Sequence, residues 1–332
     1  MRDWTSLKAT LKRGALVTAA NWPVVVVQFV AESTFKVLLG VPVVGGALLV
    51  ALALGRDLQE MLGGDLRDVL VSISDALTGQ PWALASFVAA GVIVAIGGAT
   101  IMFYLKGGTV SVLARGEAQA GPVEQPPVRL SVVRGATAFS VPAFLDGSRR
   151  FFRRYLRLGF FLFGVYGLSG GLYLTVVLTG YRLVENTGAA VAWTLVAALA
   201  SSALVVWIVL VNLVYLLVQM TVVVDDCGVR RAARHVLGLL GARPREVGGV
   251  FLVVLGLVLA ATVLSVLATA GLGLISFVPL VGLAVLPLQA AAWLVRGFVF
   301  QYLGLTALGA YLALYRPLAR PSTEAARMRT AS

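Results

Sequence analysis

Residues 191–224 read VAWTLVAALASSALVVWIVLVNLVYLLVQMTVVV, a stretch without a single charged side chain. About 18 consecutive apolar residues suffice to cross the hydrocarbon core of a bilayer, so this stretch predicts a membrane-spanning helix. Long apolar runs recur at 82–105 and 250–274. They are too long, and alternate too little, for the strands of a membrane barrel, which leaves helices as the spanning elements.

The composition extends this prediction to the whole chain. Of the 332 residues, 59% are hydrophobic and only 13% are charged, about half the charged fraction of a soluble domain. No region between the apolar runs is large enough for a globular domain with its own core. We therefore expect an all-α fold, a single polytopic membrane domain over 1–332, with six crossings at Trp22–Leu54, Trp82–Leu105, Leu158–Thr179, Ala189–Val224, Gly248–Leu274 and Val285–Tyr315.

The placement of basic residues predicts the orientation. Of the 27 Lys and Arg residues, 22 lie in four segments, namely 1–21, 106–157, 225–247 and 316–332. The positive-inside rule places such segments in the cytoplasm, so both termini are expected there, in a bacterial cytoplasmic membrane. The stretch Trp22–Leu54 is long for one upright span. We expect one tilted crossing, or one broken near Gly40-Val41-Pro42, and a seventh span remains the alternative.

Amphipathic "elbow" helices precede the later spans. Five arginines before the third span fall on one helical face, opposite Phe151, Phe152 and Tyr155. Three arginines precede the fifth span, where the apolar side is expected to consist of Val229, Ala233, Val236, Leu237 and Leu240. Such helices lie in the membrane interface with their guanidinium groups among lipid phosphates. Asp146 or Ser148, and Asp226, are expected to cap them. The arginines predicted to contact lipid headgroups are Arg149, Arg150, Arg153, Arg154, Arg157, Arg230, Arg231 and Arg234.

A weaker basic amphipathic segment opens the chain, so an internal repeat of three elbow-plus-hairpin units is predicted. A proline-containing segment from Ala114 to Arg134 is expected to be a flexible connector. The resulting organisation is a first elbow and hairpin at 1–106, a cytoplasmic linker at 107–140, a second elbow and hairpin at 141–224, a third at 225–315, and a cytoplasmic tail at 316–332.

The basic elbows, together with VVDDCGVRRA at Val223–Ala232, are the residues that carry a family resemblance. The chain loosely resembles bacterial multi-span membrane proteins such as the membrane domain of glycerophosphodiester phosphodiesterases. The likeness covers the last two hairpins. In those proteins a separate soluble barrel performs the hydrolysis, and no such barrel fits into this chain. The resemblance therefore implies a fold and a role in envelope or lipid biology, and no activity.

Polar side chains inside the predicted spans are costly and usually face a bundle interior or a cavity. Glu32 and Lys36 are spaced for a helical ion pair, and Glu32 is also expected to lie within reach of Arg296. We weighed a structural pair that docks the first helix on the last, a pathway for an ion or polar solute, and snorkelling of Lys36. The residues of this predicted polar set are Gln28, Glu32, Lys36, Asn212, Gln219, Gln289 and Arg296.

Small residues at four-residue spacing, including Gly167 and Gly171, predict close helix–helix seams. The single cysteine, Cys227, excludes an intrachain disulfide, and the single histidine, His235, excludes His-rich metal sites. We therefore assign no metal, cofactor or catalytic residue. The adjacent carboxylates Asp225 and Asp226 are explained by helix capping and the helix dipole.

The functional prediction follows from these exclusions. The arginines lie beside spans rather than in a soluble domain, so nucleic acid is excluded and anionic lipids are the expected partners. A protein partner stays open. We expect a non-enzymatic, lipid-interacting or scaffold protein of the cell envelope. The alternative is a small-solute or ion transporter or channel that uses Glu32, Lys36 and Arg296.

Overall fold

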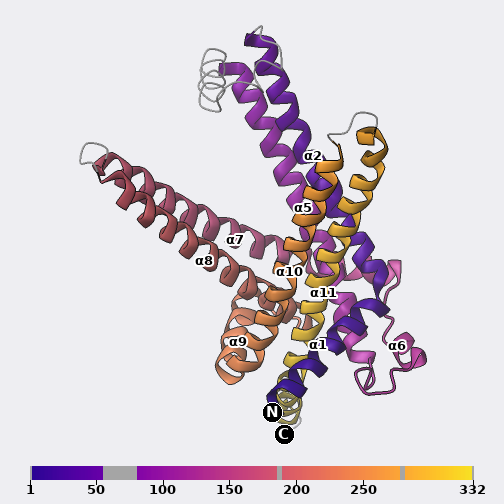
Figure 1. Ribbon diagram of the computed structural model, residues 1–332. Helices are drawn as coiled ribbons and strands as arrows, with labels where there is room; N and C mark the ends of the chain where they lie inside the picture. The colour runs from indigo at the N-terminus through magenta and orange to yellow at the C-terminus, as the bar shows by residue number, and fades with distance from the viewer. Residues whose placement is uncertain (1, 55–80, 185–188, 277–280, 331–332) are drawn as a thin grey trace. The chain divides into compact units, whose positions relative to one another are not determined.

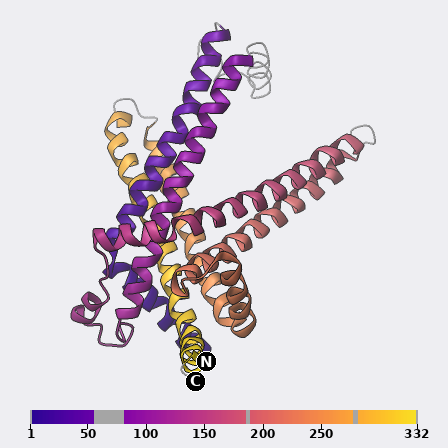
Figure 2. The same cartoon turned by 180° about the vertical axis from the view of Figure 1, so that it is seen from behind.

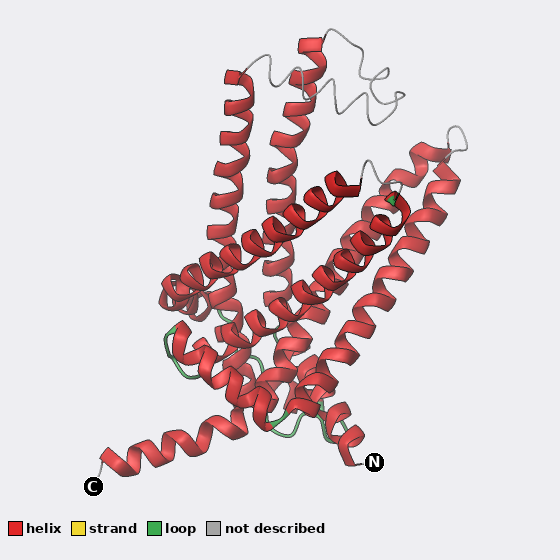
Figure 3. Cartoon of the chain, turned by 90° about the vertical axis from the view of Figure 1, so that its left-hand side faces the viewer, coloured by secondary structure: helices red, strands yellow, loops and turns green. Residues whose placement is uncertain are grey.

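The computed structural model describes residues 2–54, 81–184, 189–276 and 281–330, and every regular element within them is a helix (Figure 3). The all-α prediction is confirmed for these residues. The distribution of basic residues also predicts that segments 55–81 and 180–188 face the outer side of the membrane. Residues 55–80 and 185–188 of these segments lie outside the described part of the chain. The helices are α1 (Arg2–Ala20), α2 (Trp22–Leu54), α5 (Pro81–Gln119), α6 (Leu130–Gly135), α7 (Val141–Val184), α8 (Ala190–Val224), α9 (Val229–Ala242), α10 (Pro244–Ser276) and α11 (Val281–Thr330).

Six of these helices are long and apolar enough to cross a membrane, which agrees with the six predicted crossings. The expected break near Gly40-Val41-Pro42 is not formed, because α2 continues through these residues as one helix. The candidate spans are Trp22–Val41, Val88–Gln119, Val141–Val184, Val191–Val224, Pro244–Leu274 and Pro287–Arg316. The chain is thus a multi-pass helical membrane protein by length and composition.

The chain divides into two compact units. Residues 27–102 form the smaller one, and residues 1–26 together with 103–332 form the larger one. In the smaller unit, the ring of Phe35 on α2 lies directly over Gly98 on α5, where a β-carbon would collide with it. The absence of a side chain at Gly98 thus lets the aromatic ring pack against the neighbouring backbone.

Within the larger unit, α7 and α8 run side by side as a hairpin, as do α10 and α11 (Figures 1 and 2). Among the described residues, three hydrogen bonds between side chains join α7 to α8: Tyr166 Oη to Asn212 Oδ1 at 2.8 Å, Trp207 Nε1 to Ser169 Oγ at 2.9 Å, and Tyr173 Oη with Ser201 Oγ at 2.7 Å. Such bonds help to hold helices together in lipid, because the lipid tails are as apolar as the side chains and no hydrophobic force drives the helices together there. The sequence predicts a close helix–helix seam at Gly167 and Gly171. A β-carbon at either position, however, would have no described atom of another element within 4 Å.

The buried side chains of the larger unit gather at one end of its long helices, in what we call the base. The base consists of α1, α9, residues 107–117 of α5, 144–159 of α7, 215–222 of α8, 247–250 of α10 and 305–315 of α11. Fully buried side chains come from all seven described helices of the base and include Val17, Leu113, Tyr155, Met220 and Leu312. The base therefore has a hydrophobic core.

The buried core of the base is assembled mainly from the ends of the long helices, whereas the sequence predicts no core for the segments between the apolar runs. A helix of 39 residues such as α5 is about 58 Å long, far longer than a hydrocarbon core of about 30 Å. The surplus length of several helices is what packs together in the base.

The apolar face of the second elbow packs into the base rather than into lipid. α7 continues without a break from Val141 through the elbow into the span. Phe144, Phe151, Tyr155 and Leu158, at helical spacing, are buried, and Tyr155 Oη donates to the backbone oxygen of Gln219 at 3.0 Å. The expectation that this face lies in the membrane interface is therefore wrong for these side chains, because α5 and α8 already cover them.

The third elbow, α9, is also rotated from its predicted orientation. Its buried residues are Ala232, Val236 and Leu239, whereas Leu237, expected on the apolar side, is exposed. The first elbow, α1, packs mainly on α11 at the far end of the chain. One face of each elbow therefore packs against protein. The amphipathic pattern alone does not distinguish this role from contact with lipid.

Asn21 fixes the joint between α1 and α2. Its fully buried side chain donates to the backbone oxygens of Val17 and Ala136, both at 2.9 Å. Its Oδ1 accepts from the backbone nitrogens of Ala138 and Phe139 at 2.8 and 3.1 Å. One amide therefore satisfies four polar groups and ties the segment after α6 to the start of the first span.

Candidate functional site

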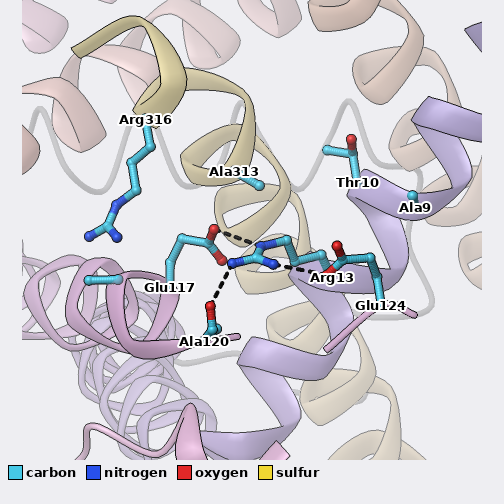
Figure 4. Close-up of a pocket in the computed structure, with 9 residues that line it drawn as sticks. Ala9, Thr10, Arg13, Glu117, Ala120, Glu124, Ala313 and Arg316 are labelled. Atoms are coloured by element: carbon cyan, nitrogen blue, oxygen red, sulfur yellow. Dashed lines mark hydrogen bonds and ion pairs between the residues drawn. The ribbon is translucent and has the colours of Figure 1, made fainter. Parts of the chain in front are cut away.

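Arg13 on α1 is the centre of a polar cluster at the edge of the base. Its Nε donates to Glu117 Oε1 at 2.7 Å, and its Nη1 donates to Glu124 Oε2 at 2.9 Å (Figure 4). The guanidinium also donates to the backbone oxygens of Ala120 and Gly121, at 3.0 and 2.9 Å. These carbonyls follow the end of α5, so Arg13 satisfies groups that no longer have helical partners. Burial opposes the charge, but the bonds and charges of Glu117 and Glu124 raise the pKa of Arg13.

A cavity of about 410 Å³ opens beside this cluster, between α1, the end of α5 and α11. Glu117 is 5% exposed, and its Oε2 has no described hydrogen-bond partner. Arg316 reaches across to the backbone oxygen of Ala114. The lining residues are Ala9, Thr10, Arg13, Glu117, Ala118, Ala120, Glu124, Ala313 and Arg316 (Figure 4).

The sequence did not indicate this cluster. Glu117 falls in the expected flexible connector, but α5 continues to Gln119 and its residues 107–114 are buried. The connector therefore begins later than expected, and the Arg13 and Asn21 contacts tie it to the base. The missed signal is the helix-compatible run of Gly107–Gln119, which no proline interrupts.

Asp226 forms a second cluster, with two of the predicted lipid-binding arginines. Its Oδ2 accepts from Arg150 Nη2 and its Oδ1 from Arg154 Nη1, both at 2.6 Å. Asp226 has a φ of 47°, a left-handed conformation that aspartate tolerates better than most residues. The hydrogen bond from Arg150, aided by that from Arg154, lowers the pKa of Asp226.

The predicted capping roles are therefore wrong. The residue before α9 is Gly228, which makes no side-chain cap bond, because Asp226 turns toward α7 instead. α7 begins at Val141, and Ser140 Oγ accepts from the backbone nitrogen of Ala143 at 3.3 Å. Asp146 and Ser148 consequently lie inside the helix rather than at its start.

Replacing Asp226 by asparagine should flatten the loss of stability at acid pH. Because the folded-state pKa of Asp226 lies below its ordinary 3.8, its contribution is complete above that value and is lost as pH falls through the lower folded value. Asp226 is 45% exposed, so we expect only about 0.5–1 kcal/mol. Thermal unfolding between pH 7 and pH 3 measures it, with the more exposed Asp146→Asn as control. An equal change in both variants would contradict the assignment.

Asp225 belongs to a third cluster, which joins the α8–α9 turn to Tyr315 of α11. His235 Nδ1 lies 2.6 Å from Asp225 Oδ2, and Tyr315 Oη donates to the same oxygen at 2.5 Å. The buried Sγ of Cys227 lies within 4.8 Å of both the Asp225 carboxylate and the imidazole. Burial, followed by the negative charge of Asp225, raises the pKa of the Cys227 thiol. The single cysteine and single histidine thus lie together, although eight positions separate them.

The predicted polar set is spread over α2, α8 and α11. Glu32 and Lys36 form the expected ion pair at 2.6 Å, and Gln28 and Gln219 are buried. Glu32 and Gln289 are half-buried, whereas Lys36, Asn212 and Arg296 are exposed. The guanidinium of Arg296 lies 5.8 Å from the ring centre of Phe300. Glu32 belongs to the smaller unit and Arg296 to the larger, so their contact stays a prediction.

Six of the eight predicted lipid-contacting arginines are exposed and have no partner among the described residues. Arg150 and Arg154 instead bind Asp226. On α7 the remaining three are spaced by four residues, which places them in one stripe about 12 Å long. The six are Arg149, Arg153, Arg157, Arg230, Arg231 and Arg234.

Comparison with known proteins gives no further assignment: no protein-family model matches the chain, and no curated protein or solved structure matches it either. A function for the chain must therefore be inferred from the arrangement of its residues. The class of protein that this arrangement defines is a multi-pass helical membrane protein. In its larger unit, the hairpins α7–α8 and α10–α11 extend from a base that has a buried core.

Proposed function

We propose that this chain is a non-enzymatic scaffold of the bacterial cytoplasmic membrane that binds anionic lipid headgroups along the arginines of α7 and α9. Both termini and the base face the cytoplasm in this proposal, as the distribution of basic residues favours. The proposal includes the elbow helices and the three elbow-plus-hairpin units. The exposed, unpartnered arginine stripe on α7 is the observation that carries it.

The position of the stripe along α7 supports this function. After the buried residues Leu158 and Gly159, the exposed side chains from Phe160 to Leu183 are mostly apolar, and the one charged residue among them, Arg182, lies near the far end. That stretch is about 36 Å long as a helix, enough to cross a hydrocarbon core. On α8 the exposed apolar side chains end near Val214, where burial in the base begins. The arginines thus lie where a membrane around the hairpin would have its phosphates.

Asp226 binds two of the five arginines before the span. The other three have no such partner among the described residues and are available for lipid. Arg150 and Arg154 lie beside the stripe residues Arg149 and Arg153 and fix the turn before α9. This turn leads into α9, which carries the second group, Arg230, Arg231 and Arg234, all exposed. Guanidinium groups bind phosphate through paired hydrogen bonds, so two such groups on a rigid base suit anionic headgroups.

The transporter alternative has weaker support. A pathway needs polar groups that converge on an interior, whereas Lys36 and Arg296 are exposed. Asn212 binds Tyr166 across the hairpin, which explains its presence in a span without a solute. Glu32 and Lys36 neutralise each other.

Changing Arg149, Arg153 and Arg157 together to glutamine should weaken retention of phosphatidylglycerol. Each basic group near an anionic surface contributes about 1 kcal/mol, so the three together correspond to roughly a 100-fold loss of affinity. Native mass spectrometry of protein from mixed phosphatidylglycerol and phosphatidylcholine nanodiscs would count the retained lipids.

The matched control changes three exposed arginines outside the stripe, Arg129, Arg134 and Arg245, to glutamine. This variant has the same net charge, so it separates the stripe from a general charge effect. We expect it to retain phosphatidylglycerol much better than the stripe variant. Equal retention by the stripe variant and the unmodified protein would refute the proposed function.

A further inference from the structure

We propose that Asp225, Cys227 and His235 form a binding site for one divalent transition-metal ion, with Zn²⁺ as the expected ion. Each residue offers one donor atom, and the carboxylate oxygen, Sγ and Nδ1 all lie within 4.8 Å of one another. This inference is independent of lipid binding, because none of the three residues belongs to the arginine groups.

The donor set fits zinc chemically. Zn²⁺ takes thiolate, imidazole and carboxylate ligands, at about 2.3 Å for sulfur and about 2.0–2.2 Å for nitrogen and oxygen. In a tetrahedral site these bond lengths separate the donors by about 3.4–3.6 Å. Asp225 Oδ2 and His235 Nδ1 are now 2.6 Å apart. The distance between these two atoms would have to increase by somewhat less than 1 Å to admit the ion. Coordination replaces the S–H bond of Cys227 by an S–Zn bond and releases its proton to solvent. His235 binds through Nδ1 as the neutral tautomer that carries its hydrogen on Nε2, so its hydrogen bond to Asp225 is replaced by the Nδ1–Zn bond.

The surroundings leave an entry route and hold the ligands in place. The His235 side chain is 43% exposed and that of Asp225 is 17% exposed, so an ion can enter from the imidazole side, while Cys227 is buried behind them. Tyr315 Oη donates to Asp225, the kind of second partner that orients a ligating carboxylate. Arg150 and Arg154 hold the adjacent Asp226 and so fix the turn that carries Asp225 and Cys227.

The position of the site gives the ion a structural consequence. The turn between α8 and α9 supplies Asp225 and Cys227, α9 supplies His235, and α11 supplies Tyr315. A bound ion would link the third elbow to the turn and, through Tyr315, to α11. The alternative is a hydrogen-bonded latch of Asp225, His235 and Tyr315 that works without metal, and the experiment distinguishes the two.

Titration of the untagged, reduced protein with Co²⁺ as the probe tests the site. Because the chain has one cysteine and one histidine, a thiolate-to-cobalt charge-transfer band can arise only from Cys227. We expect such a band at one equivalent, intense visible bands of tetrahedral cobalt, and displacement of both by Zn²⁺. Cys227→Ser should abolish the charge-transfer band, and His235→Asn should lower the affinity at least 10-fold.

Tyr315→Phe should lower the affinity about 10-fold through the second shell, whereas Tyr311→Phe, one turn earlier on α11, should leave it unchanged. Zn²⁺ should also slow alkylation of Cys227 in the unmodified protein, and a chelator should restore the rate, which requires no variant. A folded protein that shows no charge-transfer band and no Zn²⁺ protection would overturn the proposal and leave the latch. Metal binding unaffected by Cys227→Ser would overturn it as well.

Discussion

Arg13→Met should destabilise the protein by about 3–5 kcal/mol, the usual cost of removing one partner from a buried ion pair. The side chain of Glu117 is only 4% exposed and that of Arg13 19% exposed. Without the guanidinium, the largely buried Glu117 carboxyl group would lose its hydrogen-bonded cationic partner. Three further acceptors, including the backbone oxygens of Ala120 and Gly121, would also lose their donor.

Equilibrium unfolding in detergent, followed by tryptophan fluorescence, measures this cost. Lys8→Met removes a positive charge from an exposed position on the same helix and should change stability by no more than about 0.5 kcal/mol. The double variant Arg13→Met with Glu117→Gln should recover part of the loss, because the buried charge is then absent. A loss below about 1 kcal/mol for Arg13→Met would show that the cluster behaves as a surface ion pair.

Gly14→Ala should cost about 3 kcal/mol, at the upper end of the range for overpacking. At this position α1 crosses α11 so closely that a β-carbon would lie 2.5 Å from the backbone nitrogen of Ala310 and from the backbone oxygen of Thr306. On the other side of the contact, a β-carbon on Gly309 would lie 3.0 Å from Gly14 Cα. Both obstacles are helical backbone, so no rotamer change can relieve the clash and the helices must separate.

The larger Gly14→Leu should prevent the base from forming, and its folded yield should fall accordingly. Tyr302 Oη would then also lose its bond to the backbone oxygen of Ala15. Gly164 on α7 provides the matched control, since a β-carbon there meets no described atom. Gly164→Leu should therefore fold normally. Folded yield and unfolding free energy are the measurements, and a Gly14→Leu protein as stable as Gly164→Leu would refute the close crossing.

Several features could be predicted from the sequence because they depend on neighbouring residues. A hydropathy window identifies a span without knowledge of its partners, so the number of long apolar helices was predicted correctly. The four-residue spacing of Glu32 and Lys36 predicts their ion pair, because one helical turn brings the two side chains together. The helical period likewise places Arg149, Arg153 and Arg157 on one face.

Other features were decided only by contacts between residues far apart in the chain. Arg13 and Glu117 are 104 positions apart, and Asp225 and Tyr315 are 90 apart. No local pattern distinguishes Asp226 as a cap from Asp226 as a partner of two arginines, because both roles require an acid just before a helix. An amphipathic face, similarly, buries equally well in lipid or in protein.

The sequence by itself therefore determined that this is a multi-pass helical protein, because transfer into lipid depends on each segment's own composition. The tertiary structure decided that the helix ends build a packed base, that Gly14 is the close crossing point, and that Cys227 lies beside His235. The physical reason is that burial, ion pairing and metal-ligand geometry depend on which side chains the fold brings within a few ångströms of one another.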